Sequence, residues 1–179
     1  MRGICLFVFI LFPAALNAQR FISEKSLVIF FSAAAIEDIT AQNTKAVAIF
    51  DTGTGDIAFS IPVREFLFAK ALMQEHFNEK YLESEKFQKS TFQGKIAGYV
   101  SGTVGAQNVR AIGKLTIHGI TQEVDIQGTI EESKNKLLLN SKFIVVLETY
   151  GIIRPQLLWQ NIAEQVEVSI EFTLKPYEK

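Results

Sequence analysis

The sequence predicts an all-β protein, and three observations lead to this prediction. Short segments in which apolar and polar residues alternate recur along the chain, which is the pattern of strands that bury one face. Turn residues separate these segments at the spacings typical of sandwiches and barrels. The chain of 179 residues is also long enough for one well-buried domain and short for two.

The alternating segments can be placed in order along the chain. Residues 166–172 are the clearest case, because Val, Val, Ile and Phe alternate there with Glu and Ser. The other predicted strands are 27–32, 47–50, 57–61, 91–99, 108–112, 114–117, 123–126 and 137–147. Together these segments give about eight strands.

Two hairpins are indicated by their turns. The run "DTGTGD" at residues 51–56 joins the strand at 47–50 to the strand at 57–61. A second turn at residues 118–121 joins the strands at 114–117 and 123–126. The alternation places Leu115, Ile117, Val124 and Ile126 on the inner face.

One stretch has a helical period instead. Apolar residues recur four positions apart at Ala69, Met73, Phe77 and Tyr81. Glutamates occupy the opposite side at Glu75, Glu79 and Glu83. We therefore expect an amphipathic helix that lies on the sheet and frays near Asn78.

The composition predicts an apolar interior. Hydrophobic residues make up 48% of the chain, including 15 Phe, whereas 21% of the residues are charged. Such an interior is either packed by side chains or filled by a ligand. The net charge is −1, without a Lys/Arg cluster, so a nucleic-acid partner is not predicted.

The first eighteen residues predict export. They combine one Arg, an apolar run from Ile4 to Phe12 and small residues that end at Ala18. The run is shorter than the roughly 20 residues needed to cross a bilayer, so we expect a signal peptide over residues 1–18 and no membrane-spanning segment. Residues 19–179 would form the mature domain, located in the periplasm or secreted. The single cysteine, Cys5, lies in the removed segment.

A metal-dependent enzyme is the sharpest alternative. His76 and Glu79 are three positions apart, and with Glu75 and His118 they could converge on a metal ion. Against this, the strand alternation points His118 outward and the helical period places the glutamates away from Phe77. Hydrogen-bonding or ion-pairing roles are therefore favoured, and no catalytic set, no metal site and no cofactor are predicted.

Four phrases in the sequence resemble the YceI-like family of exported lipid-binding proteins. They are "FFS" at 30–32, "LMQEHFNEKYLESEKF" at 72–87, "STFQGKI" at 90–96 and "GKLTIHGITQEV" at 113–124. The resemblance implies a lipocalin-like, eight-stranded antiparallel barrel with a short helical insertion. It also implies a long isoprenoid chain, such as a polyprenyl quinone tail, as the bound ligand.

The alternation then predicts which residues would line the cavity of such a barrel. They are Phe59, Ile61, Phe66, Phe68, Met73, Phe77, Phe92, Leu115, Ile117, Val124, Phe143, Val145, Val168 and Ile170, with Tyr150 and Trp159 at the rim. The same residues could instead fill an ordinary core, as in an envelope-stress scaffold. The expected protein is a monomer or a weak dimer.

Overall fold

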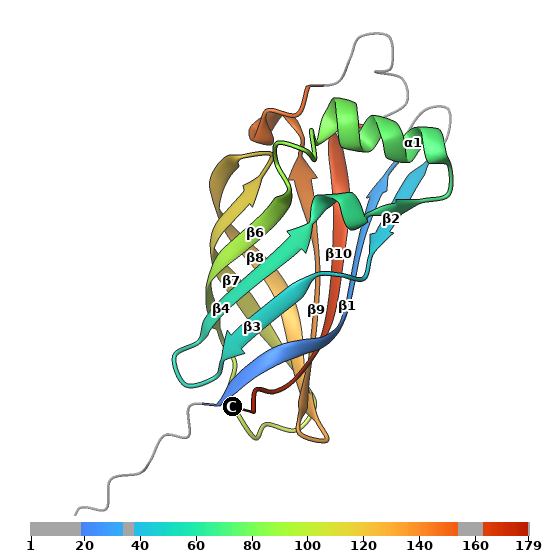
Figure 1. Ribbon diagram of the computed structural model, residues 1–179. Helices are drawn as coiled ribbons and strands as arrows, with labels where there is room; N and C mark the ends of the chain where they lie inside the picture. Colours follow the sequence, from blue (N-terminus) through green and yellow to red (C-terminus); the bar gives the residue numbers. More distant parts are fainter. Residues whose placement is uncertain (1–18, 34–37, 154–162, 179) are drawn as a thin grey trace, which may run out of the picture.

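The computed structural model describes residues 19–33, 38–153 and 163–178, which form a closed antiparallel β-barrel (Figure 1). Within these ranges the strands are β1 (Arg20–Ser32), β2 (Ile39–Asn43), β3 (Val47–Asp51), β4 (Asp56–Pro62), β5 (Leu67–Phe68), β6 (Lys89–Ala97), β7 (Ala106–Ile117), β8 (Ile120–Ser133), β9 (Lys136–Val146) and β10 (Gln165–Pro176). Eight of them follow one another around the barrel in the order β10, β9, β8, β7, β6, β4, β3 and β1, and β1 pairs with β10 to close it. The predicted fold class is confirmed.

Alternating burial explains why these segments are strands. In β10, Val166, Ile170, Phe172 and Leu174 are buried, whereas Glu171 between two of them is exposed. Each strand thus buries one face inside the barrel and presents the other to water.

The strand β7 corrects the prediction of two separate segments at 108–112 and 114–117. Gly113, which lies between the two predicted segments, is inside one continuous strand, opposite Gly94 of β6. A Cβ atom on Gly113 would lie 2.3 Å from the backbone oxygen of Gln93, and one on Gly94 would lie 2.3 Å from the backbone oxygen of Ile112. Glycine is therefore used here because two backbones approach closely.

Two short strands, β2 and β5, were not predicted. β2 pairs with β1 over Val28–Ser32, in the same register in which β3 pairs with Arg20–Ile22 of β1. Residues 44–46 leave the sheet between β2 and β3, next to the fully buried Asn43. The Asn43 side chain donates a 2.8 Å hydrogen bond to the Pro62 carbonyl and accepts one of 2.8 Å from the Lys45 amide. β5 then extends the sheet beyond β2.

Helix α1 (Ala71–His76) continues without a break into a wider helical turn, η2 (Phe77–Tyr81), and together they cross one end of the barrel (Figure 1). Ala69, expected to lie on the apolar stripe, precedes the helix and is exposed. Met73, Phe77 and Tyr81 keep the predicted side, since Phe77 and Tyr81 are buried and Met73 is half-buried.

The predicted fraying near Asn78 is wrong. The Leu82 amide donates to the Phe77 carbonyl at 2.9 Å, a spacing one residue wider than in an α-helix. The Asn78 side-chain amide donates to the Gln74 carbonyl at 3.0 Å, which ties the wider turn back to α1. The turn widens here instead of ending.

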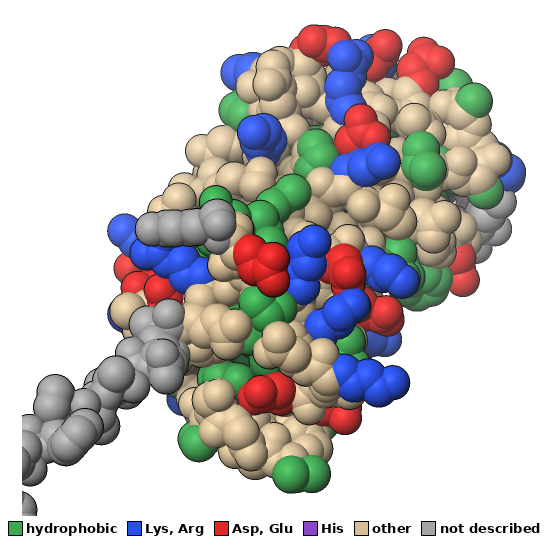
Figure 2. Space-filling model, turned by 60° about the horizontal axis from the view of Figure 1, so that its bottom comes forward, with side chains coloured by type: hydrophobic (Ala, Val, Ile, Leu, Met, Phe, Trp, Pro, Cys, Tyr) green, Lys and Arg blue, Asp and Glu red, His purple; other side chains and the backbone are tan. Residues whose placement is uncertain are grey.

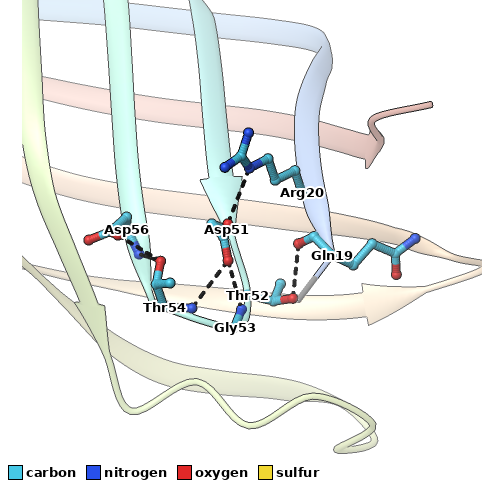
Figure 3. A network of polar contacts seen from close by, with 7 residues as sticks. All are labelled: Gln19, Arg20, Asp51, Thr52, Gly53, Thr54 and Asp56. Atoms are coloured by element: carbon cyan, nitrogen blue, oxygen red, sulfur yellow. Dashed lines mark hydrogen bonds and ion pairs between the residues drawn. The ribbon is translucent and has the colours of Figure 1, made fainter. Parts of the chain in front are cut away.

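The end of the barrel opposite α1 is held by local hydrogen bonds in the β3–β4 turn (Figure 3). Asp51 Oδ1 accepts from the amides of Gly53 at 3.0 Å and Thr54 at 3.2 Å, and Arg20 Nε lies 3.3 Å from Asp51 Oδ2. The hydrogen bond from the Thr54 amide, helped by Arg20 and Gly53, lowers the pKa of Asp51 below its ordinary value. The predicted hairpin is confirmed.

Charged side chains of both signs alternate over the outer surface, as the face in Figure 2 shows. Three pairs join neighbouring strands: Lys95 with Asp56 at 2.8 Å, Lys142 with Glu167 at 2.7 Å, and Arg110 with Asp125. Lys136 of β9 pairs with Glu24 of β1 at 2.6 Å, across β10. Among the described residues, no helix has both the length and the apolar character needed to cross a membrane.

Candidate ligand-binding cavity

A cavity of about 380 Å³ occupies the half of the barrel that lies beneath α1. We call this the upper half, and the half that contains the β3–β4 turn the lower half. The walls are formed by inward-facing residues of β1, β4, β7, β9 and β10, and α1 and η2 contribute the cover. The cavity exists because the strands bury one apolar face without filling the space that this face encloses.

An aromatic cover, formed by Phe30, Phe66, Phe68 and Phe77, closes part of the upper half. Phe77 lies at its centre, with ring centroids 5.4 Å from Phe30, 5.5 Å from Phe66 and 5.0 Å from Phe68. The Phe30 and Phe77 rings are stacked, whereas Phe30 meets Phe66 and Phe68 edge to face. These contacts attach the helix to the wall through β1 and the segment around β5.

Most of the residues predicted to line a cavity do so. The structure places at its surface Phe59, Ile61, Phe66, Phe68, Met73, Phe77, Leu115, Ile117, Phe143, Val145, Val168 and Ile170. Apart from Phe66, which follows the short turn η1 (Val63–Glu65), they lie in strands or in the helical segment. Whether they contact a ligand stays a prediction.

Phe92 and Val124 are the two predicted lining residues that lie elsewhere. Phe92 is 0% exposed, and its ring stacks on that of Phe59, its pairing partner in β4, with centroids 5.1 Å apart. It lines a second, smaller void and not the cavity. Val124 packs against the core without reaching the cavity surface. Alternation fixes which face a residue takes, but not its depth along the barrel axis.

A further group of lining residues near the cover is not predicted by the sequence pattern. They are Val28, Phe30, Ser32, Ile39, Leu72, His76, Tyr81, Leu82, Ser90, Leu147, Ile152 and Val166. A signal was available for Val28 and Phe30, since residues 27–32 were predicted as a strand. Ile39 belongs to β2, and Ile152 follows the short turn η3 (Glu148–Tyr150), neither of which was expected.

The polar side chains at the cavity surface all belong to its upper part. Ser32 accepts a 3.1 Å hydrogen bond from the Ala163 amide, so its hydroxyl is already engaged. Burial raises the pKa of Tyr81 above its ordinary value. His76 and Ser90 complete the set. The deeper walls are apolar, so the cavity suits a ligand with a long apolar part and one polar end.

Of the two predicted rim residues, the structure describes only Tyr150. Tyr150 is only 4% exposed, and it packs into the core next to the upper end of the barrel. Trp159 lies outside the described residues.

The predicted outward orientation of His118 is wrong, because its side chain is only 12% exposed. Nε2 lies 2.9 Å from Glu83 Oε2, Nδ1 lies 3.3 Å from the Tyr150 carbonyl oxygen, and the ring meets Phe87 with centroids 4.4 Å apart. His118 has a φ angle of +50° in the β7–β8 turn, which directs its side chain away from the strand alternation. It therefore links two segments beside the cavity, one after η2 and one at η3.

The residues of the alternative metal hypothesis are separated. His118 is paired with Glu83, whereas His76 lies at the cavity surface and Glu75 and Glu79 are exposed. Within the described part of the chain, no group of three or more His, Cys, Asp or Glu side chains is placed to hold a metal ion.

A comparison with protein-family models identifies the family. The model of the YceI-like domain matches residues 21–174, which covers all strands of the barrel. The chain belongs to the YceI-like family. The resemblance found in the sequence is thereby confirmed, while a search of the curated proteins found no match.

Solved structures share the YceI-like barrel at low sequence identity. A polyisoprenoid binding domain from Saccharophagus degradans, implicated in plant cell wall breakdown, has a TM-score of 0.75 at 13% identity and covers 90% of this chain and 100% of its own. BcnA from Burkholderia cenocepacia has a TM-score of 0.70 at 17% identity, over 83% of this chain and 95% of its own. The YCEI protein of Campylobacter jejuni has a TM-score of 0.56 at 11% identity, over 99% and 94%. These similarities show the fold.

Proposed function

We propose that this protein is an exported binding protein that holds a long-chain isoprenoid, such as a polyprenyl quinone, or a similar single-chain amphiphile. The observation that carries the proposal is the cavity of about 380 Å³ with apolar deeper walls and polar side chains only near the cover. One solved structure with the same fold is a polyisoprenoid binding domain, which supports this choice of ligand. Export to the periplasm, or beyond the cell, is proposed from the sequence of residues 1–18.

The physical argument is that an isoprenoid tail needs only an apolar lining. Transferring about ten methylene equivalents from water at about 0.8 kcal/mol each gives about 8 kcal/mol. That free energy corresponds to roughly micromolar affinity if the cavity is preformed. The aromatic cover supports preformation, since Phe77 and Phe30 each contact the other three rings of the cover. No reacting group is required, and we propose carriage or storage rather than catalysis.

The test is native mass spectrometry of the protein purified from its own cell envelope, followed by organic extraction and analysis of the extract. We expect the native protein to carry a stoichiometric adduct of several hundred daltons. Organic extraction should remove this adduct, and the extract should contain an apolar, single-chain compound. An adduct-free protein that also fails to bind added farnesol or ubiquinone after delipidation would contradict the proposal.

A matched pair of variants tests whether the adduct occupies the cavity. Val168→Asp places a carboxylate in the cavity wall, and we expect it to abolish the adduct because a charge in an apolar cavity is strongly disfavoured. Ser169→Asp adds the same charge to the neighbouring residue of β10, which faces outward near Lys142, and should retain the adduct. Retention in both variants would place the ligand elsewhere.

His76→Ala distinguishes the proposal from the metal hypothesis. The variant removes the one histidine at the cavity surface but leaves the apolar walls intact. We expect the mass of the adduct and its stoichiometry to be unchanged. Metal analysis of the same samples completes the test. If the wild-type protein carries a metal ion that His76→Ala loses, the result would instead favour a metal-dependent enzyme at the helix.

A further inference from the structure

The cavity stops halfway along the barrel, although the barrel itself continues. Beneath it lies a separate void of about 40 Å³, roughly a tenth of the cavity volume. Phe59, Phe143 and Ile170 are the residues that line both spaces. These three side chains, which we call the floor, therefore separate the cavity from the void.

The floor comes from opposite walls of the barrel. Phe59 projects inward from β4, Phe143 from β9 and Ile170 from β10. Val168, which lies opposite Phe143 in the β9–β10 pairing, is at the cavity surface one inward position above Ile170. The floor residues thus come from both sides of the barrel and do not follow a single strand.

Packed side chains support the floor from below. Phe59 stacks on Phe92 with an interplanar angle of 14°, and the Phe59 ring centroid lies 6.3 Å from that of Phe172. Phe92 is fully buried and Phe172 is 3% exposed. Closely packed rings resist deformation, so Phe59 is held in a fixed position, whereas Phe143 and Ile170 border the void.

A glycine fixes the position of Phe92 in turn. A Cβ atom at Gly94 would lie 2.8 Å from Cζ of the Phe92 ring. The ring therefore lies over the bare backbone of β6, in space that any other residue at position 94 would occupy. This arrangement stacks Phe92 on Phe59, its pairing partner in β4.

The polar groups of the cavity give the ligand a direction. His76 and Ser90 lie at the upper end, whereas the floor is wholly apolar. The free energy is lowest when a polar head remains near His76 and the apolar tail points down to the floor. The distance between His76 and the floor then limits the length of the tail.

We propose that Phe59, Phe143 and Ile170 act as a ruler that sets the longest tail this cavity accepts, an inference that rests on the proposed lipid-binding function. Up to the floor, each added carbon gains apolar burial. A longer tail has to displace packed aromatic rings or leave its excess in water. Affinity should therefore rise with length, reach a maximum and then fall or level off.

The experiment measures binding of geraniol, farnesol, geranylgeraniol and a longer polyprenol to the delipidated protein, by calorimetry and by competition in native mass spectrometry. Phe143→Ala joins the cavity to the void, so the preferred tail should lengthen by at least one isoprene unit. Val168→Phe fills space above the floor, so the preferred tail should shorten. In both variants we expect the ratio of the Kd values of adjacent alcohols to change by at least about tenfold.

The control is Phe68→Ala, which removes an aromatic ring from the cover without touching the floor. It should weaken all alcohols by a similar factor and keep their ranking. Val168→Phe adds atoms to existing space and leaves no hole, so it tests the ruler even if Phe143→Ala fails to fold.

The outcomes separate the ruler from the proposed function. If the wild-type protein binds the alcohols but Val168→Phe and folded Phe143→Ala keep its length ranking, the ruler is wrong and the binding function stands. If the wild-type protein binds none of them, the proposed function fails and the ruler fails with it. A shift of the preferred tail length in opposite directions in Phe143→Ala and Val168→Phe supports both proposals.

Discussion

The upper and lower halves of the barrel are built from the same strands, yet their interiors differ. In the upper half the inward residues of β9 and β10 surround a cavity, whereas in the lower half Ile130, Leu137 and Leu174 are fully buried in a packed core. The upper end is covered by a helix, and the lower end is tied by a short hydrogen-bonded turn. The difference indicates a division of labour in which the lower half stabilises the barrel and the upper half is available for a ligand.

The largest expected effect comes from truncating the core of the lower half. Phe92→Ala should lower the free energy of unfolding by about 3–5 kcal/mol. The substitution removes a fully buried ring and leaves a cavity that the surrounding side chains fill only in part. Phe68→Ala, in the upper half, should cost about 1–2 kcal/mol, since that side chain already borders empty space. Urea denaturation of the delipidated variants checks both values, and equal losses would contradict the division.

The second prediction concerns the close approach of β6 and β7 in the lower half. Gly113→Ala should cost about 1–3 kcal/mol, because its Cβ atom would lie 2.3 Å from the Gln93 backbone oxygen, which cannot move without its strand. Ala58→Ser, which adds one heavy atom on the outward face of β4, should change the free energy of unfolding little. Thermal unfolding of the two variants measures both effects. A loss of stability in Gly113→Ala alone indicates a local backbone conflict, whereas similar losses in both variants would indicate that the sheet is sensitive to any substitution.

A smaller and more local effect is expected in the upper half. His118→Ala removes the contacts to Glu83 and Tyr150, which are worth about 1 kcal/mol in total at a partly exposed site. Hydrogen exchange should become faster in residues 82–87 and 147–152, while lower-half strands keep their protection. A uniform increase across the whole barrel would contradict this assignment.

The smallest expected effect is the pH dependence of the β3–β4 turn. The pKa of Asp51 is lowered in the folded protein, so its carboxylate stabilises the fold above the ordinary Asp pKa, and this contribution is lost as the pH falls through the lowered value. Asp51→Asn should therefore be less stable than the wild type at pH 7, and the difference should fade in acid. Urea denaturation at several pH values measures it. If Asp51→Asn remains less stable than the wild type at pH values below the pKa of Asp51 in the folded protein, the effect comes from the shape of the side chain and not from its charge.

The sequence predicted the fold well because its information is local. Alternation in residues 166–172 and the turn at 51–56 each specify an element without knowledge of the rest of the chain. β2 was missed since a five-residue strand with polar Thr, Gln and Asn carries a weak signal, and it forms because β1 offers it an edge. The strand β7 was predicted as two segments on either side of Gly113, because only the neighbouring strand shows why a glycine is needed there.

The candidate site was predicted less completely, and the errors have one physical origin. Phe59 and Phe92 both point inward and are indistinguishable by pattern, yet one lines the cavity and the other lies below it. His118 was expected to face water, but a positive φ angle in its turn redirects it to Glu83. Depth along the axis and the direction of a turn residue depend on partners far away in the sequence.

The sequence by itself determined the class of fold, the amphipathic helix and the apolar character of the interior. These follow from the period of hydrophobic residues, which is a property of each segment alone. Only the tertiary structure decided that the interior is divided, with a cavity above Phe59, Phe143 and Ile170 and a packed core below them. That division depends on how side chains from opposite walls fill a common volume, and no single segment contains this information.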